Sequence, residues 1–204
     1  MNDKRGHWSE ISFMLMLRKT YYVKLLTNLY KKFIKALVLK KNENNTLYLL
    51  VDMMNFYAFT LSLRNNSLIQ LKILNDVCII DYPEKVDRFE LNYNLSSIKY
   101  NFRFFIKSYT SAYAPSLSNI FNSANWIERE CWDMFGIFFT NHPDLRRILT
   151  DYGFDGFPLR KDFPLTGYIE IRYDDEKANI VYEPLELSQE YRLFNFTSPW
   201  EKIK

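Results

Sequence analysis

The charged run Glu128–Asp133 is the densest group of side chains that could do chemistry, and its spacing is that of a helix. At 100° per residue, Glu128 projects onto the apolar face of this helix, among residues that should be buried. A carboxylate on a buried face is costly unless it is paired or hydrogen-bonded. We therefore predict that Glu128 forms a structural ion pair with Arg146 or Arg147, rather than acting as a catalytic acid or base.

The other charged residues of the run project onto the opposite, polar arc of the same helix. Arg129, Glu130 and Asp133 lie on this arc together with Trp126. A large aromatic side chain on an exposed, charged face is more often a contact anchor than an accident. The pattern therefore predicts that Trp126 and its charged neighbours face a partner.

Elsewhere the residues needed for common active sites are scarce. The chain has two histidines, two cysteines and five glycines, and no glycine-rich phosphate-binding motif. These numbers do not favour a histidine-based metal site, a disulfide framework, an iron–sulfur cluster or a nucleotide loop. His142 has Asp144 nearby but no third metal ligand, and Cys131 should be an inert buried thiol. No catalytic, cofactor-binding or metal-binding residue is predicted.

Composition and charge describe a globular protein with two different ends. Of 204 residues, 48% are apolar and 25% charged, which is typical of a folded domain. Residues 1–50 carry ten Lys or Arg against three Asp or Glu, whereas residues 128–204 carry ten against fifteen. Phe, Tyr, Met, Ile, Asn and Lys total 88 residues, against 29 for Gly, Ala, Arg and Pro. That bias indicates an AT-rich, organellar gene, and no apolar run is long enough to span a membrane.

Hydrophobic periodicity predicts a set of helices and strands, and its clearest feature is a long antiparallel hairpin. The lysine-rich face of the first helix would either be solvated or meet anionic lipid or RNA. The predicted elements are a helix over 20–41, a strand over Thr46–Val51, a helix over Asn55–Arg64, a strand over Leu68–Asp81, a hairpin over residues 89–107 that turns near Ser96-Ser97, and a helix over 117–135 that is capped by Ser116 or Ser118 and ends at Gly136.

From residue 140 onward regular periodicity is almost lost, while aromatic residues stay frequent. So long an irregular stretch is unusual inside one compact domain, yet it is too aromatic to be a solvated linker. We therefore predict an extended tail whose aromatic side chains are buried against another chain. The expected organisation is an N-terminal extension over 1–19, a globular domain over 20–139 and a partner-wrapping segment over 140–204.

The run NWIERECWDMFG at Asn125–Gly136 closely resembles the NuoC-type, 30-kDa subunit of respiratory complex I, the mitochondrial subunit 9 family. The similarity continues through Asn141–Gly156, Pro158–Tyr168 and Ile169–Asp175. It implies an α+β fold, in which helices are layered on a mixed, largely antiparallel sheet and an extended irregular C-terminal tail follows. It also implies a subunit of NADH:ubiquinone oxidoreductase that binds no cofactor itself. FMN, iron–sulfur clusters and ubiquinone would belong to neighbouring subunits, and electron transfer from NADH to ubiquinone would be coupled to proton pumping.

The resemblance also implies partners and a location. The principal partner would be the NuoD-type subunit, with other iron–sulfur subunits of the peripheral arm nearby, on the matrix side of the mitochondrial inner membrane. Phe157 stands where relatives commonly have histidine, so an apolar contact should suffice there. The residues expected to face partners are Trp126, Arg129, Glu130, Asp133, His142, Tyr152, Phe154, Phe157, Arg160, Lys161, Asp162, Phe163, Tyr168 and Trp200.

Two alternatives remain open at this point. The same motifs would fit the homologous subunit of a chloroplast plastoquinone-reducing complex or of a membrane-bound hydrogenase. A different class, a nucleic-acid-binding module, could use the N-terminal lysines and the hairpin aromatics as a stacking platform. The acidic C-terminal third argues against that second alternative.

Overall fold

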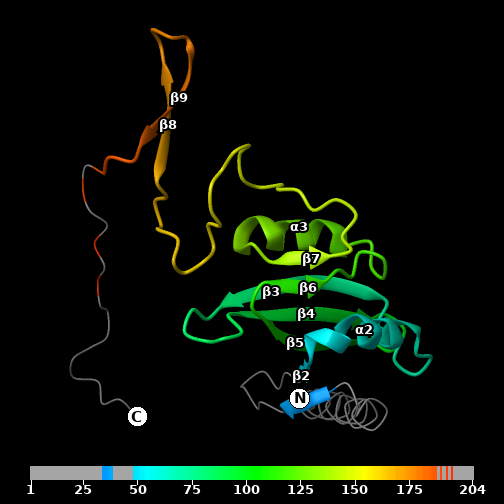
Figure 1. Cartoon of the computed structure of the whole chain (residues 1–204). Helices are drawn as coiled ribbons and strands as arrows, with labels where there is room; N and C mark the ends of the chain where they lie inside the picture. The colour runs from blue at the N-terminus through cyan, green and yellow to red at the C-terminus, as the bar shows by residue number, and fades with distance from the viewer. Residues whose placement is uncertain (1–33, 39–47, 188, 190–191, 193, 195–204) are drawn as a thin grey trace, which may run out of the picture. The chain divides into compact units, whose positions relative to one another are not determined.

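The computed structural model describes residues 34–38, 48–187, 189, 192 and 194, and its elements follow one another as shown in Figure 1. By their contacts, one compact unit reaches to Phe163 and a second begins at Pro164. The elements are β1 (Ile34–Val38), β2 (Tyr48–Val51), the 3-10 turn η1 (Met53–Asn55), α2 (Phe56–Asn65), β3 (Ile73–Asp81), β4 (Phe89–Ser97), β5 (Phe102–Thr110), β6 (Tyr113–Pro115), α3 (Ala124–Phe135), β7 (Phe138–Thr140), β8 (Ile169–Asp174) and β9 (Asn179–Pro184).

The first unit is built on a mixed five-stranded sheet in the order β1-β2-β5-β4-β3. Only the β2–β5 pairing is parallel, and the other three neighbouring pairs are antiparallel. The predicted α+β fold with a largely antiparallel sheet is therefore confirmed. The β6 and β7 strands form a separate, two-stranded parallel ladder.

The core lies on one face of the sheet, around the fully buried ring of Tyr93 on β4. Phe56 of α2 packs on this ring with 4.5 Å between ring centroids. From α3, Glu128 and Cys131 lie close enough to Tyr93 to raise the pKa of its hydroxyl further, beyond the larger effect of burial. Both helices therefore bury the face of the sheet that carries Tyr93.

The long hairpin is confirmed, but its turn lies further along the chain than predicted. Ser97 still pairs with Phe102, so the strand continues past the predicted turn at Ser96-Ser97. The turn comprises residues 98–101 and is closed by Asn101 at φ 49°. Asparagine tolerates this left-handed backbone better than most residues, which places the turn there.

The helix predicted over residues 20–41 is wrong where it can be compared with the structure. Ile34–Val38 is strand β1, paired antiparallel with β2, while residues 20–33 and 39–41 lie outside the described residues. An amphipathic pattern of five residues fits a strand as well as a helix. Pairing with β2 decides between them, because it satisfies the backbone groups of both strands.

Among the other predicted elements, two match the structure and two begin later than predicted. The predicted strand over Thr46–Val51 is confirmed as β2 within the described residues, and the helix over Asn55–Arg64 is confirmed as α2. The strand predicted from Leu68 begins only at Ile73, after Gln70 takes a left-handed φ of 48°. The helix predicted from residue 117 begins at Ala124, and neither Ser116 nor Ser118 caps it.

Residues 140–163 differ most from expectation, because they pack on the first unit instead of forming the start of an extended tail. The boundary predicted at 139/140 therefore lies at 163/164 in the structure. The second unit contains the antiparallel hairpin of β8 and β9, whose alternating pattern the sequence already showed in part. No helix among the described residues is long and apolar enough to cross a membrane.

Candidate partner interface

Glu128 is fully buried as predicted, but its partners are not arginines. It accepts a hydrogen bond of 2.6 Å from the Ser116 hydroxyl and one of 2.7 Å from the Leu117 backbone N–H. The turn that precedes α3 supplies both donors, and burial raises the pKa of this carboxyl to about 7. The predicted ion pair with Arg146 or Arg147 is wrong, because local backbone and hydroxyl donors satisfy the carboxylate instead.

His142 lies beside Glu128, and its imidazole is fully buried. The Asp144 backbone N–H donates to Nδ1 over 3.1 Å, so Nδ1 is the unprotonated nitrogen and Nε2 carries the hydrogen. Nε2 lies 3.2 Å from the Asn125 carbonyl oxygen and 3.9 Å from the Glu128 carboxylate. The side chain predicted to face a partner therefore serves contacts within its own unit.

Asp133 is also fully buried, although the helical projection placed it on the exposed arc. The loop after β7 folds over it and donates the backbone N–H groups of residues 148–150 and the Thr150 hydroxyl, at 2.6–3.1 Å. Burial alone would raise the pKa of this carboxyl, but these hydrogen bonds outweigh burial and hold the pKa below its usual value. The Arg147 guanidinium also lies 3.3 Å from the Asp133 carboxylate.

Arg88 fixes the end of the first unit by bridging two aspartates. Its guanidinium binds Asp81 at 2.6 and 2.7 Å and Asp162 at 2.9 and 3.0 Å. The hydrogen bond from Arg88 holds the pKa of Asp81 below its usual value. The Lys161 backbone N–H also donates to Asp81, at 2.9 Å, and Arg160 Nε donates to the Phe135 carbonyl oxygen at 2.6 Å.

Gly136 lets this last segment approach the end of α3. The residue has φ 74°, and its N–H bonds the Trp132 carbonyl oxygen at 2.9 Å, which confirms the predicted helix end. A Cβ at this position would lie 2.5 Å from Arg160 and 2.6 Å from the Phe157 ring. The Phe157 ring packs on Trp132 at 5.8 Å, so the apolar contact expected at this position is made within the chain.

Trp126 remains exposed, as its position on the polar arc of the helix predicts. Its side chain is 66% exposed, and the Arg129 guanidinium lies 5.1 Å from its ring. Arg129 itself is buried and donates to the Arg146 carbonyl oxygen at 3.2 Å, whereas Glu130 is exposed. Of the residues of this helix that were predicted to face a partner, Trp126 and Glu130 are therefore the exposed ones.

The hairpin of the second unit has one face made entirely of apolar side chains. Because directly paired residues share a face, the register groups these side chains and leaves the charged ones, including the Arg172–Glu183 pair at 2.8 Å, on the other face. Five of the six apolar residues are 54–61% exposed. The apolar hairpin face consists of Ile169, Ile171, Tyr173, Ile180, Tyr182 and Pro184.

The remaining residues predicted at the interface divide between the two units. Tyr152 is fully exposed and Phe154 packs against Phe163 with 6.0 Å between ring centroids, both in the first unit. Tyr168 is exposed at the start of the hairpin in the second unit. Trp200 lies outside the described residues.

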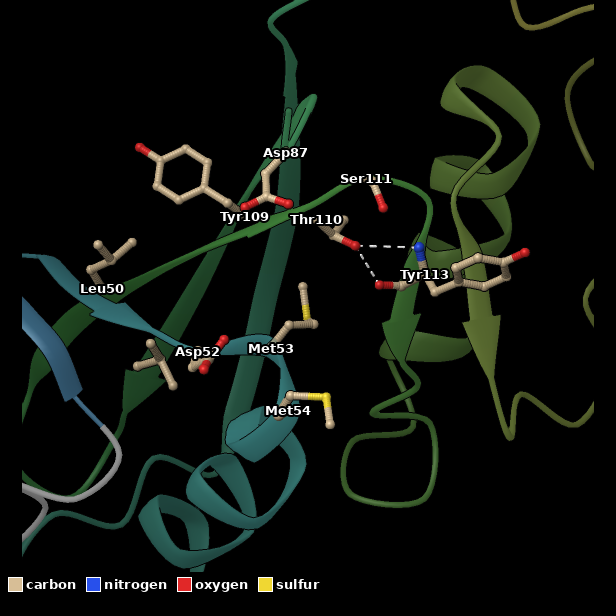
Figure 2. Close-up of a pocket in the computed structure, with 10 residues that line it drawn as sticks. Leu50, Asp52, Met53, Met54, Asp87, Tyr109, Thr110, Ser111 and Tyr113 are labelled. Carbon is tan, nitrogen blue, oxygen red and sulfur yellow. Dashed lines mark hydrogen bonds between the residues drawn. The ribbon is translucent and has the colours of Figure 1, made fainter. Parts of the chain in front are cut away.

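A pocket of about 300 Å³ opens at one end of the sheet, between η1 and the connection from β5 to β6 (Figure 2). Met53 and Met54 of η1 line it, and the Thr110 hydroxyl donates to the Tyr113 carbonyl oxygen at its wall. Asp52 and Asp87 are its charged lining residues. Within the described part of the chain, no group of three or more His, Cys, Asp and Glu side chains could hold a metal ion.

Comparison with known proteins identifies the family. Residues 49–169 match the family described as respiratory-chain NADH dehydrogenase, 30 Kd subunit. The match covers more than half of the chain, from β2 to the first residue of β8. The chain belongs to this family. All the anchors described above, from Asp81 to Asp162, therefore lie within the part that the 30 kDa subunits share.

Individual relatives agree with this assignment. Subunit 9 of the NADH-ubiquinone oxidoreductase of Acanthamoeba castellanii is 82% identical over 189 residues, which cover 93% of this chain and 97% of that protein. The NADH dehydrogenase [ubiquinone] iron-sulfur protein 3 of Solanum tuberosum is 49% identical, over 84% of this chain and 90% of that protein.

Two solved structures share the fold of this chain. A trypsin-resistant fragment of Nqo5 matches with a TM-score of 0.50 and 24% identity, over 63% of this chain and 99% of the fragment. A chain of an archaeal membrane-bound sulfane sulfur reductase matches with a TM-score of 0.61 and 20% identity, over 72% and 86%. At these identities the likeness concerns the fold alone.

Proposed function

We propose that this chain is a non-catalytic structural subunit of the peripheral arm of respiratory complex I. Its role is to hold the NuoD-type subunit, and iron–sulfur subunits near it, in a fixed arrangement. FMN, iron–sulfur clusters and ubiquinone are assigned to those neighbours. The site of action is the matrix side of the mitochondrial inner membrane, and the gene is assigned to the organelle genome because of the composition bias. The family, shown above, supports this proposal.

The apolar hairpin face carries the proposal of a structural role. A two-stranded hairpin is marginally stable by itself in water, and here its six apolar residues share one face. Exposed apolar area of this kind marks a protein contact. A partner that covers this face supplies the burial that the hairpin lacks, which is how a subunit in a permanent complex is expected to be built.

Contacts within the first unit hold the residues that immediately precede the second unit. Residues 160–162 are tied to the sheet by Arg88 and Asp81, immediately before the second unit begins at Pro164. Because residues 160–162 are already held in place, docking of the residues that follow them costs less conformational entropy. Arg160 and Asp162 make contacts within the first unit, while Lys161 and Asp162 stay exposed, so their contact with a partner remains a prediction.

Isolation of the assembled complex tests the proposal. A tagged copy of the full chain, expressed in the mitochondria from which the complex is purified, should co-migrate on a native gel with the NuoD-type subunit and with flavin and iron–sulfur subunits. Mass spectrometry of that band identifies the chains. Migration of the tagged chain alone, or with nucleic acid, would contradict the proposal.

The alternatives receive less support. The homology to mitochondrial NADH-ubiquinone oxidoreductase subunits does not favour a plastoquinone-reducing or hydrogenase-type complex. For the nucleic-acid-binding module, the lysines that suggested it lie mainly outside the described residues. No contact in the described part of the chain favours this class over a subunit of the respiratory complex.

A further inference from the structure

Another pocket of the first unit lies between the end of α2, the start of β3 and the loop before α3. Its volume is about 260 Å³. The Ser123 hydroxyl donates to the Leu74 carbonyl oxygen over 2.9 Å and so ties two of its walls together. We call it the Arg64–Lys72 pocket, after the two charged residues among those that line it.

The described part of the chain leaves the positive charge of this pocket without a counter-ion. Residues 53–75 and 91–127, which supply every lining residue, contain no Asp or Glu. Neither Arg64 nor Lys72 takes part in any of the ion pairs among the described residues. Two cations that line one pocket repel each other, so an anion between them would be bound favourably.

The neighbours of Arg64 indicate which kind of anion fits. Its guanidinium lies over the buried Phe121 ring, 5.8 Å from the ring centroid. A guanidinium stacked in this way can still direct N–H groups from its edge at both oxygens of a carboxylate. Ile73 and Ile120 add apolar lining, which suits the methylene groups of an acidic side chain and offers nothing to a free phosphate.

We propose that the Arg64–Lys72 pocket binds the carboxylate of a glutamate or aspartate side chain from a neighbouring subunit. Arg64 supplies the contact to two oxygens, and Lys72, which is exposed, supplies the second positive charge. The inference rests on the proposed function, because it requires a neighbouring subunit. It goes beyond that function by assigning a second contact, made by the first unit and separate from the apolar hairpin face. Charge complementarity selects an acidic segment over a basic one.

Coupling with a carbodiimide tests the occupant, because this reagent joins a lysine amine to a carboxylate only where the two lie in contact. In the purified complex, it should join Lys72 by an amide bond to an Asp or Glu of another subunit, which mass spectrometry of the peptides identifies. Coupling of Lys72 to its own chain would overturn the inference. So would a Lys72 left uncoupled while other lysines of the complex react. In both cases co-purification of the chain would still support the proposed function.

Charge reversal tests whether this contact contributes to assembly. Lys72→Glu should weaken association of the full chain with the rest of the complex by about tenfold or more, while Lys72→Arg, which keeps the charge, should leave association nearly unchanged. Lys99→Glu is the matched control, because Lys99 is an exposed base that does not line the pocket. Equal association of the Lys72→Glu and Lys99→Glu variants would overturn the inference. A chain that never joins the complex would overturn the proposed function and this inference together.

Discussion

Glu128 and Asp133 stand on the same helix and are both fully buried, yet their carboxyl pKa values move in opposite directions. Glu128 receives hydrogen bonds from Ser116 and Leu117, which do not offset its burial. Asp133 accepts hydrogen bonds from three backbone N–H groups and one hydroxyl, and these outweigh the effect of burial on its pKa. The balance between desolvation and hydrogen-bond donors, which differs around the two carboxyl groups, therefore sets the direction of each pKa shift.

The pH dependence of stability tests the account of Glu128. Its pKa in the folded chain is about 7, above the value of 4.5 in the unfolded chain, so between these values only the folded chain holds this proton. The contribution of Glu128 to stability is therefore greatest below pH 4.5 and declines, by on the order of 3 kcal/mol, as the pH rises to 7. Glu128→Gln should remove this decline in urea unfolding curves of the full chain. An unchanged pH profile in the variant would refute the assignment.

Asp133→Asn should loosen the loop over residues 145–156. The amide has one oxygen for the donors of residues 148–150 and Arg147, so the expected loss of stability is about 2–4 kcal/mol. The lowered pKa means that the stabilising effect of Asp133 is present above pH 3.8 and is lost as the pH falls through its folded value. Urea unfolding near pH 7 measures the loss. Glu130→Gln, at an exposed position of the same helix, is the control and should change little.

Substitutions at two glycines distinguish the energetic cost of backbone strain from the cost of close packing. Gly136 and Gly153 have almost the same φ, 74° and 75°, but only Gly136 has side chains within reach of a new Cβ. Gly153→Ala should therefore cost about 1 kcal/mol from strain alone. Gly136→Ala should cost clearly more, because Phe157 and Arg160 must shift. Equal thermal unfolding midpoints for the two variants would contradict the close approach of residues 157–160 to α3.

At the scale of elements, the sequence predicted what depends on local pattern. The β4–β5 hairpin, α2 and the end of α3 at Gly136 follow from alternation, helical spacing and a glycine that accepts positive φ. The strand β1 was predicted incorrectly because its antiparallel pairing with β2, and not its own apolar pattern, decides its conformation. The start of α3 was predicted too early, at residue 117 instead of Ala124. Ser116 has the right residue type for a helix cap, but its hydroxyl is used by Glu128.

Arg88 should control how firmly the segment before Pro164 is held. Arg88→Gln removes its ion pairs to Asp81 and Asp162 and leaves the Asp81 carboxylate without its main partner. Trypsin should then cleave after Arg160 or Lys161 faster than in the unchanged chain. Arg103→Gln, at an exposed position of β5, serves as the control. If both variants were cleaved at the unchanged rate, the Arg88 bridge would not be what holds this segment.

At the scale of the whole molecule, the sequence predicted a separate C-terminal part from residue 140, whereas the second unit begins at Pro164, and its binding to a partner stays a prediction. Residues 140–163 looked irregular because their order comes from side-chain anchors such as Asp133 and Arg88, which carry no periodic signal. Only from residue 164 onward does a separate unit begin.

The central claim is that the apolar hairpin face contributes by binding another subunit, and one substitution tests it most directly. Ile171→Lys places a charge on that face, whereas Glu170→Lys places the same charge on the opposite face of the same strand. The fraction of each full-length variant that co-migrates with the complex on a native gel is the measurement. We predict that Ile171→Lys is largely lost from the complex and that Glu170→Lys is retained. Full retention of Ile171→Lys would contradict the account.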